Sequence, residues 1–399
     1  MARILLTGAA IVVLMTFMVV GVPLLRSMPE TAVVLGEPSV LEVFEIHDNI
    51  GSGLGERAPE FAGISKWINS QPLTIEKLRG KVVLIDFWTY TCVNCIRTMP
   101  FLRDWQEKYA DLGLVIVGVH TPEFEFEKNT DNVRAASTKF GLEYPIAQDN
   151  EFGTWKAFSN RFWPAKYLID ANGVVRYTHF GEGAYGETEL AIRELLRETG
   201  ARSAGIERNE DDGPTLVPDA VVQDPEGRIT RELYGGWQRN ATSNGLYIAH
   251  TAYYEGTKQT LDYVDPGGHI NQFLFLHGRW SRELESIKHG RETLHYEDYI
   301  ALKFFARSAN IVIDLEEGVD PFMVKVTIED DGVERALLPE EAGVDIVYEG
   351  GESFLHVDEG QMYFVVSLPD FDSRELRFAS NSADFGLFAM TFGAYPDID

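Results

Sequence analysis

Residues 81–95 constrain the fold more than any other stretch, because a buried strand runs almost directly into a pair of cysteines. The strand reads Lys-Val-Val-Leu-Ile-Asp-Phe-Trp, a β-branched and aromatic run typical of a strand covered on both faces. Cys92 and Cys95 follow, and they are the only cysteines of the chain. Two thiols are too few for a disulfide-stapled scaffold or a four-cysteine zinc site. The pattern therefore favours a redox pair.

The segments around this pair predict alternating strands and helices. A helical pattern continues from the cysteines to a stop at Gly113, and a second buried strand follows at 114–120. The pair Asn172-Gly173 is a strong hairpin signal between two strand-like runs in 166–180. Further helices are expected at 127–140, 151–160 and 186–200. Together these elements predict an α/β fold with helices on both faces of a sheet.

Beyond residue 229 the sequence changes to short runs in which apolar and polar residues alternate, separated by turns that contain glycine. This spacing predicts an antiparallel β-sandwich. The expected strands are 229–233, 300–306, 311–315, 322–328, 353–357, 362–368, 375–379 and 385–392.

The N-terminus carries 22 uncharged residues from Ile4 to Leu25, flanked by Arg3 and Arg26. As a helix this stretch would span roughly 33 Å, enough to cross a bilayer core. It is longer than the apolar part of a signal peptide, and no Ala-x-Ala cleavage site follows. We expect an uncleaved signal-anchor rather than a cleaved signal peptide, with the globular part outside the cytoplasm.

These patterns divide the chain into five segments. They are an N-terminal transmembrane anchor helix or signal peptide (1–26), a tether (27–56), a redox domain (57–200), a linker (201–228) and a β-sandwich (229–399).

The charge is concentrated in the second half of the chain. The net charge is -27, and residues 201–399 carry 37 acidic against 16 basic side chains. This balance argues against nucleic-acid binding, which needs clustered Lys and Arg. We interpret the acidity mainly as a solvated surface. Calcium binding is a second interpretation, although the chain contains no Asp-rich calcium loop of the EF-hand type.

The cysteine pair suits thiol–disulfide exchange. Cys92 lies at a helix N-terminus, where backbone N–H groups and the helix dipole favour a thiolate. A thiolate attacks a disulfide, and a second thiol resolves the mixed disulfide. We expect Cys92 to attack and Cys95, one turn inside the helix, to resolve. No cofactor is needed beyond a redox-active Cys92–Cys95 disulfide. The alternatives are inert core cysteines or half of a metal site.

The chain resembles the thioredoxin superfamily. Asp86-Phe87-Trp88, the Cys92-Val-Asn-Cys95 motif and Pro100 match thioredoxin in residue type and spacing, and Trp163-Pro164 resembles the cis-proline loop. The likeness is greatest to TlpA-like proteins and to the extracytoplasmic part of DipZ-type disulfide reductases. The matching segments include Ala58-Pro-Glu-Phe61, 88–100, 120–124, 144–149 and 163–170, and more weakly 376–378 with 385–393.

This resemblance implies the fold and roles for several residues. It implies a thioredoxin-like domain followed by a jelly-roll-like module similar to a carbohydrate-binding module. Asp86 would accept the proton of the resolving thiol, because burial raises the pKa of a carboxyl group; a structural pairing is the alternative. Trp88, Trp163 and Pro164 would contact the substrate, although both tryptophans could equally be packing residues. For His120 and Glu123, which follow the second strand, we expect structural roles.

The resemblance also implies partners. These are cysteine-containing envelope proteins and a separate membrane thiol-electron transducer of the DsbD or CcdA kind, because the sequence offers one hydrophobic span where DipZ-type proteins have several. Thioredoxin has a lysine near its buried Asp, and residues 114–120 contain none. The sequence therefore does not show which lysine would assist a proton transfer from Cys95 to Asp86.

Two other functions remain open. A peroxiredoxin-like peroxidase needs Pro-x-x-x-Thr/Ser-x-x-Cys, and this chain has Thr89 but carries Ile85 in place of the proline. A glycan-binding role would use aromatic side chains of the C-terminal module. The candidates are Trp237, Tyr253, Tyr254, Tyr263 and Trp280. Most aromatic residues of a sandwich belong to its core, so we favour a docking or spacer role for the module.

Overall fold

The computed structural model of the protein describes residues 54–202, 205–208, 229–240, 245–255, 259–330 and 332–395. The expected anchor at 1–26, nearly all of the tether and most of the linker lie outside these residues. Within the described ranges, no helix combines the length and the apolar character needed to cross a bilayer.

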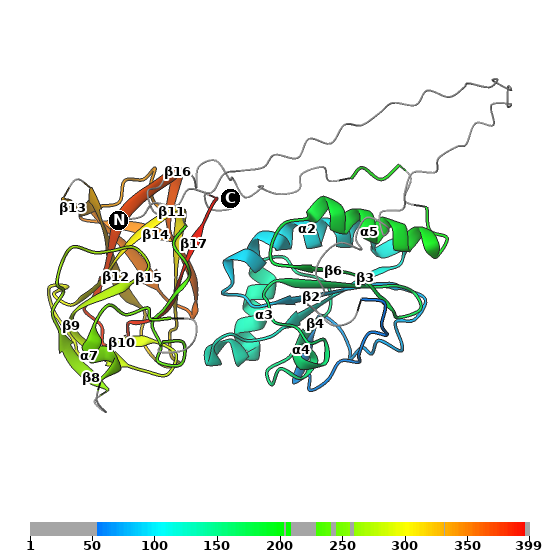
Figure 1. The fold of residues 1–399 in the computed structure, drawn as a ribbon, viewed down its shortest axis with the longest axis horizontal. Coiled ribbons are helices and arrows are strands. Elements are labelled where there is room, and N and C mark those ends of the chain that lie inside the picture. The colour runs from blue at the N-terminus through cyan, green and yellow to red at the C-terminus, as the bar shows by residue number, and fades with distance from the viewer. Residues whose placement is uncertain are drawn as a thin grey trace, which may run out of the picture. The chain divides into compact units, whose positions relative to one another are not determined.

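The first domain (described residues 54–202, here the α/β domain) is built on a six-stranded sheet of order β1-β4-β3-β2-β5-β6 (Figure 1). Strands β2, β3 and β4 are parallel, whereas β1, β5 and β6 are antiparallel to their neighbours. The strands are β1 (Lys66–Ile68), β2 (Val82–Trp88), β3 (Leu114–His120), β4 (Ile146–Gln148), β5 (Ala165–Ile169) and β6 (Val175–Phe180). The expected buried strands and hairpin are present.

Helices complete this domain on both sides of the sheet. α2 and α5 pack on one side and α4 on the other (Figure 1). The helices are α2 (Val93–Tyr109), η2 (Ala110–Leu112), η3 (Glu125–Lys128), α3 (Thr130–Lys139), α4 (Gly153–Ala157) and α5 (Tyr185–Glu198). Gly113 ends η2 with a left-handed backbone (φ 106°), which glycine adopts without strain. The single helix expected at 127–140 is two helices, because Asn129 caps a new one.

The alternation along β2 decides which side chains meet α2. Leu84 and Trp88 belong to the core that also contains α2 and α5, whereas Val83, Ile85 and Phe87 belong to the opposite core. Successive residues of a strand face opposite ways. Asp86 therefore faces the α2 side of the sheet, together with Leu84 and Trp88.

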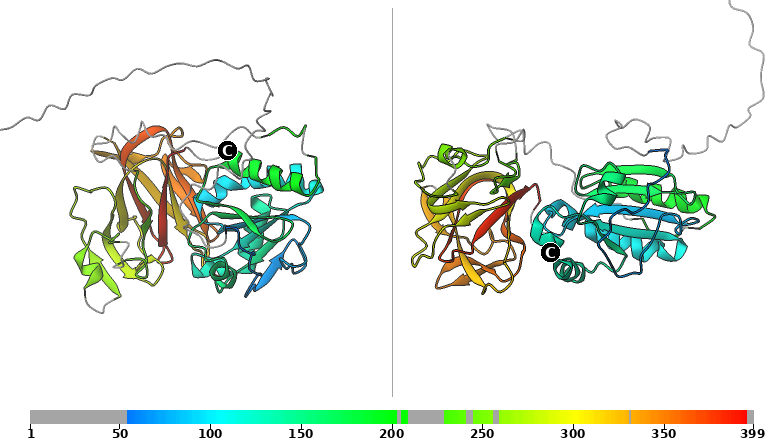
Figure 2. Two further views of the ribbon diagram at one scale, coloured as in Figure 1. Left: turned by 45° about the vertical axis from the view of Figure 1, so that its right-hand side comes forward. Right: turned by 90° about the horizontal axis from the view of Figure 1, so that it is seen from below.

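The C-terminal domain (described residues from 229 to 395) is all-β, as expected (Figure 2). Its strands form one hydrogen-bonded sheet of eleven, and β11, β17, β10 and β9 close into a small barrel because β9 also pairs with β11. The two separate sheets of a sandwich are thus joined. The strands are β7 (Leu233–Tyr234), β8 (Thr260–Tyr263), β9 (Leu274–Arg282), β10 (Ile287–His289), β11 (Tyr299–Ile313), β12 (Phe322–Asp330), β13 (Val333–Ala336), β14 (Ile346–Glu349), β15 (Glu352–Val357), β16 (Gln361–Ser380) and β17 (Gly386–Gly393). A short helix, α7 (Thr251–Tyr254), precedes β8.

Two long strands, β11 and β16, join the two halves of the C-terminal domain into one sheet. The run expected at 300–306 and the first three residues of the run at 311–315 belong to β11. The runs expected at 362–368 and 375–379 are both part of β16. The pairing of β11 with β16 shifts register between Ala306 and Ser308. Such a bulge bends a strand without ending it, so one strand serves both halves of the domain.

The described residues of the two domains contact each other through the segment that follows β3. Phe124 and Phe126 pack edge-on against Phe388 of β17, with ring centroids 5.4 and 5.2 Å away. Beside them, Glu123 forms a 2.7 Å ion pair with Arg239. The segment is thus fixed by apolar and by charged contacts.

Close approach of the backbone to Trp88 requires Gly118 on β3. A Cβ atom there would lie 2.9 Å from Trp88 Nε1 and 3.1 Å from the Tyr144 ring. Gly118→Ala should therefore lower the free energy of unfolding by about 1–3 kcal/mol through overpacking. Urea unfolding followed by tryptophan fluorescence measures this. The control is Gly386→Ala, whose Cβ would meet nothing closer than 3.5 Å. Equal stability of both variants would contradict the packing argument.

Candidate active site

The N-terminus of α2 holds the first sulfur. Cys92 is the N-cap residue with an extended backbone (φ −85°, ψ 109°), and its Sγ accepts the backbone N–H of Cys95 at 3.2 Å. An amide donor and the positive end of the helix dipole both stabilise a sulfur anion. Cys92 is half-buried, so part of the residue remains accessible to a substrate. The geometry suits a sulfur that attacks a substrate disulfide.

The second sulfur is deeper. Cys95 is fully buried, and its thiol donates to Cys92 Sγ at 2.6 Å. Both cysteines are free thiols. Burial raises the pKa of Cys95 well above its ordinary value, and the hydrogen bond and charge of Cys92 and the charge of Asp86 raise it further. Cys95 therefore needs a base before it can attack a disulfide.

A buried ion pair lies on the same side of the sheet. Asp86 and Lys166 are directly opposite each other on β2 and β5, with Nζ 3.3 Å from Oδ1, and both are at most 1% exposed. Burial raises the pKa of Asp86, and the neighbouring Lys166 ammonium lowers it in part. A carboxyl group with a raised pKa can accept the proton of a thiol. Lys166 supplies the lysine that residues 114–120 lack, from a different strand.

Glu127 is a second buried acid that the sequence analysis missed. Its carboxylate is 0% exposed and accepts the hydroxyl of Thr91, the residue before Cys92, at 2.5 Å. It also accepts the backbone N–H groups of Glu123 and Phe124. Burial raises the pKa of Glu127 to about 7. Glu127 thus ties the loop that precedes Cys92 to the segment that contacts the C-terminal domain.

The three residues expected to contact a substrate differ in how far their side chains are exposed. Trp88 is 1% exposed and packs edge-on against His120, which fits the packing role, one of the two roles considered for it. Trp163 is half-buried; its Nε1–H donates to the backbone oxygen of Thr121 at 3.0 Å. The bond between Trp163 and Pro164 is cis, as the resemblance implies. Of the three, Trp163 alone keeps a partly exposed side chain.

His120 and Glu123 have the contacts of structural residues. His120 is 0% exposed between the rings of Trp88 and Tyr90, and burial lowers its pKa to about 3, so it is neutral. Glu123 is held by Arg239 and by the hydroxyl of Tyr234 at 3.0 Å. Among the described residues no group of three or more acidic, His or Cys side chains could hold a metal ion.

Comparison with known proteins agrees with this geometry. Residues 54–191 match the family model described as Redoxin, and residues 230–393 match one described as thioredoxin like C-terminal domain. The thiol-disulfide oxidoreductase YkuV of Bacillus subtilis is 31% identical over 147 residues, which cover 37% of this chain and 98% of YkuV. The chain belongs to the redoxin family of thiol-disulfide oxidoreductases. Cys92 and Cys95 both lie within the residues that match the redoxin model.

The chain is also similar to larger proteins. Protein DipZ of Mycobacterium bovis is 39% identical over 259 residues, which cover 64% of this chain and 35% of DipZ. The chain thus spans about a third of the length of the DipZ proteins that it matches. A solution structure of a thioredoxin-like protein in the oxidised form is 30% identical, covers 36% of this chain and 95% of that chain, and has a TM-score of 0.34.

Removal of one member of the buried ion pair should be costly. Asp86→Leu leaves the Lys166 ammonium without its counter-ion, and we expect the free energy of unfolding to fall by about 3–5 kcal/mol. The double variant with Lys166→Leu should regain most of this loss, because no buried charge remains. Urea unfolding of the single and double variants measures the coupling. A double variant no more stable than Asp86→Leu would contradict it.

The raised pKa of Glu127 predicts a pH dependence of stability. The folded protein keeps this proton up to about pH 7, whereas the unfolded chain loses it near 4.5. Its stabilising contribution is therefore complete below pH 4.5 and is lost as the pH rises to 7. Relative to Glu127→Gln, the unfolding free energy of the wild type should fall by about 3 kcal/mol over this range.

A neighbouring acid provides the control for this titration. Glu125→Gln changes an exposed carboxylate of the same 3-10 helix, and it should leave the pH dependence as in the wild type. Parallel curves for wild type and Glu127→Gln would show that Glu127 ionises normally in the folded state.

Proposed function

We propose that the chain is a membrane-tethered, extracytoplasmic enzyme that reduces disulfides of other envelope proteins through Cys92 and Cys95. The observation that carries this proposal is the arrangement of the two sulfurs. Cys92 accepts an amide hydrogen bond at a helix N-terminus, and the buried Cys95 thiol lies 2.6 Å away. One sulfur is thus placed to attack and the other to resolve.

The reaction proceeds in two exchanges. The Cys92 thiolate attacks one sulfur of the substrate disulfide, the substrate S–S bond breaks, and the leaving thiolate takes up a proton. Cys95 then gives its proton to Asp86 and attacks Cys92 Sγ, which releases the second substrate thiol. The substrate disulfide is reduced to two thiols, and the enzyme dithiol is oxidised to a disulfide. Lys166 keeps Asp86 able to ionise within the core, since its charge opposes the effect of burial.

Reduction is favoured over oxidation by the likeness to DipZ. The dipeptide Val93-Asn94 between the cysteines does not determine the potential, which spans about 150 mV among such folds. Reduction requires electrons from another protein, and we propose a separate membrane thiol-electron transducer, of the DsbD or CcdA kind. The extracytoplasmic, membrane-anchored location is supported by the 22 uncharged residues from Ile4 to Leu25.

The C-terminal domain resembles a carbohydrate-binding module of the jelly-roll kind, and a glycan partner has less support than a docking role. Tyr253, Tyr263 and Trp280 are buried. Trp237 is 37% exposed, but the Arg282 guanidinium lies over its ring at 4.2 Å. The contacts with Glu123, Phe124 and Phe126 favour docking against the α/β domain.

A peroxidase function also has less support. Peroxiredoxin chemistry needs a hydroxyl beside the attacking cysteine. Thr89 is 0% exposed, and its hydroxyl contacts His120 Nε2 at 3.4 Å. Ile85, rather than a proline, precedes it in the motif.

A trapping experiment tests the proposed function. Cys95→Ser cannot resolve the mixed disulfide, so it should hold its target covalently through Cys92 in envelope preparations. Non-reducing electrophoresis and mass spectrometry of the adducts identify the substrate. Cys92→Ser is the matched control and should trap nothing. Adducts formed equally by Cys92→Ser, or by neither variant, would contradict the assignment of Cys92 as the attacking residue.

A further inference from the structure

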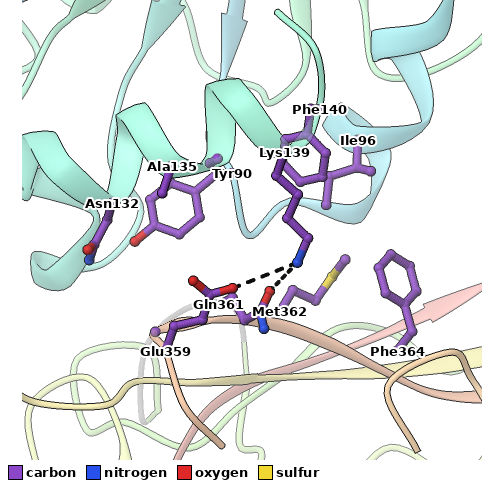
Figure 3. Close-up of a pocket in the computed structure, with 12 residues that line it drawn as sticks. Tyr90, Ile96, Asn132, Ala135, Lys139, Phe140, Glu359, Gln361, Met362 and Phe364 are labelled. Carbon is purple, nitrogen blue, oxygen red and sulfur yellow. Dashed lines mark hydrogen bonds and ion pairs between the residues drawn. The ribbon is translucent and has the colours of Figure 1, made fainter.

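A pocket of about 180 Å³ lies where the α/β domain meets the C-terminal domain (Figure 3). One wall comes from Tyr90, from Ile96 of α2 and from one side of α3. The other wall comes from the turn before β16 and from Met362 and Phe364 of β16. The pocket is therefore shaped by both domains, and the α/β domain alone would leave it half-formed.

The pocket adjoins the cysteine pair in the chain and through hydrogen bonds. Tyr90 stands two residues before Cys92. Ile96 directly follows Cys95, and its N–H donates to the backbone oxygen of Cys92 at 3.0 Å. Two residues of the wall are thus part of the loop and the helix turn that carry the reactive sulfurs. Residues four apart lie on the same face of a helix, so Ile96 places this wall of the pocket on the side of α2 that carries Cys92.

The lining is mainly apolar. Ile96 and Met362 are 9% and 3% exposed, Phe140 and Phe364 are half-buried, and the methyl group of Ala135 is exposed. A dry cavity of about 150 Å³ lined by such side chains is large enough to hold benzene. The pocket therefore has room for one large apolar side chain, such as that of phenylalanine.

The wall also contains a buried polar group. The hydroxyl of Tyr90 has the Asn132 side chain as its polar neighbour. Figure 3 shows it turned toward the side on which Asn132 and Glu359 lie. Tyr90 therefore contributes mainly its ring to the wall of the pocket.

The rim carries a contact that can open. Lys139 Nζ lies 2.6 Å from Gln361 Oε1 and 3.9 Å from Glu359, and it joins α3 to the turn before β16 (Figure 3). The Lys139 and Glu359 side chains are each 52% exposed. An exposed pair of this kind contributes little stability, so a ligand can displace it at small cost.

We propose that this pocket binds an apolar side chain of the polypeptide whose disulfide Cys92 attacks. The apolar lining holds the side chain, and Met362 and Phe364 of β16 supply one wall of the pocket. This inference rests on the proposed function, and it assigns a role in substrate selection to the C-terminal domain.

A peptide series tests the pocket. Short Gly/Ser peptides with one cysteine are prepared as mixed disulfides with 5-thio-2-nitrobenzoate, with a single Phe at each position within four residues of the cysteine. The reduced enzyme breaks the mixed disulfide and releases the coloured thiolate. At the best position, Phe should raise the rate about tenfold over the all-Gly/Ser peptide, because the ring is buried.

Filling the pocket should remove this preference. Ala135→Phe places a ring in the pocket from an exposed helix position, so the fold is retained. The ratio of the two peptide rates should fall from about ten to about one. Phe364→Ala, which opens the wall on β16, should lower the same ratio. Thr138→Phe is the matched control, since Thr138 is exposed on α3 outside the pocket, and it should keep the tenfold preference.

A small substrate separates this inference from the proposed function. The same mixed disulfide of free cysteine does not reach the pocket, and its rate should be equal in all variants. Equal peptide rates in the wild type, or a tenfold preference that survives in Ala135→Phe, would overturn the pocket assignment. Failure to reduce even the cysteine disulfide would overturn the proposed function, and the pocket assignment with it.

Discussion

The hydrogen bond from the backbone N–H of Cys95 to Cys92 Sγ is the constraint on which the site depends. It exists only while α2 begins at Val93, because a shift of the helix start would move the free amides away from the sulfur. The start of α2 is determined in turn by β2, which ends at Trp88 with every residue buried. The reactivity of one sulfur thus rests on the packing of a central strand.

Much of the α/β domain could be predicted from the sequence, because its elements are short and strongly patterned. β2, β3 and the hairpin of β5 and β6 lie where periodicity and turn residues indicate. The C-terminal domain was harder to predict. Turn-forming residues such as Pro369-Asp370 suggest a break, but β16 continues through them. Pro369 and Asp370 lie in the bulge between the paired residues Ser367 and Asp372, and pairing with β11 on both sides of the bulge carries the strand through. A single sequence does not contain that information.

For the site as well, the sequence predicts what depends on local pattern and misses what depends on long-range contacts. The roles of Cys92 and Cys95 follow from their spacing after a strand, which is local. Lys166 was missed, because its pairing with Asp86 depends on the register between β2 and β5. The available signal was a single lysine in the otherwise uncharged strand β5. Glu127 stands in an acidic segment that reads as surface, and its burial depends on contacts with Thr91. The sequence left two roles open for Trp88, because its close packing on Gly118 depends on the pairing of β2 with β3.

The position of β17 in the chain has a consequence for biosynthesis. This strand comes after every other described strand, yet Phe388 packs on Phe124 and Phe126, and Gly393 leaves room for Arg97 of α2. A chain is made from its N-terminus, and domains fold as they emerge. During translation the α/β domain therefore exists first without this cover, and the loop beside its reactive thiols reaches its final contacts only when the ribosome has almost finished the C-terminal domain.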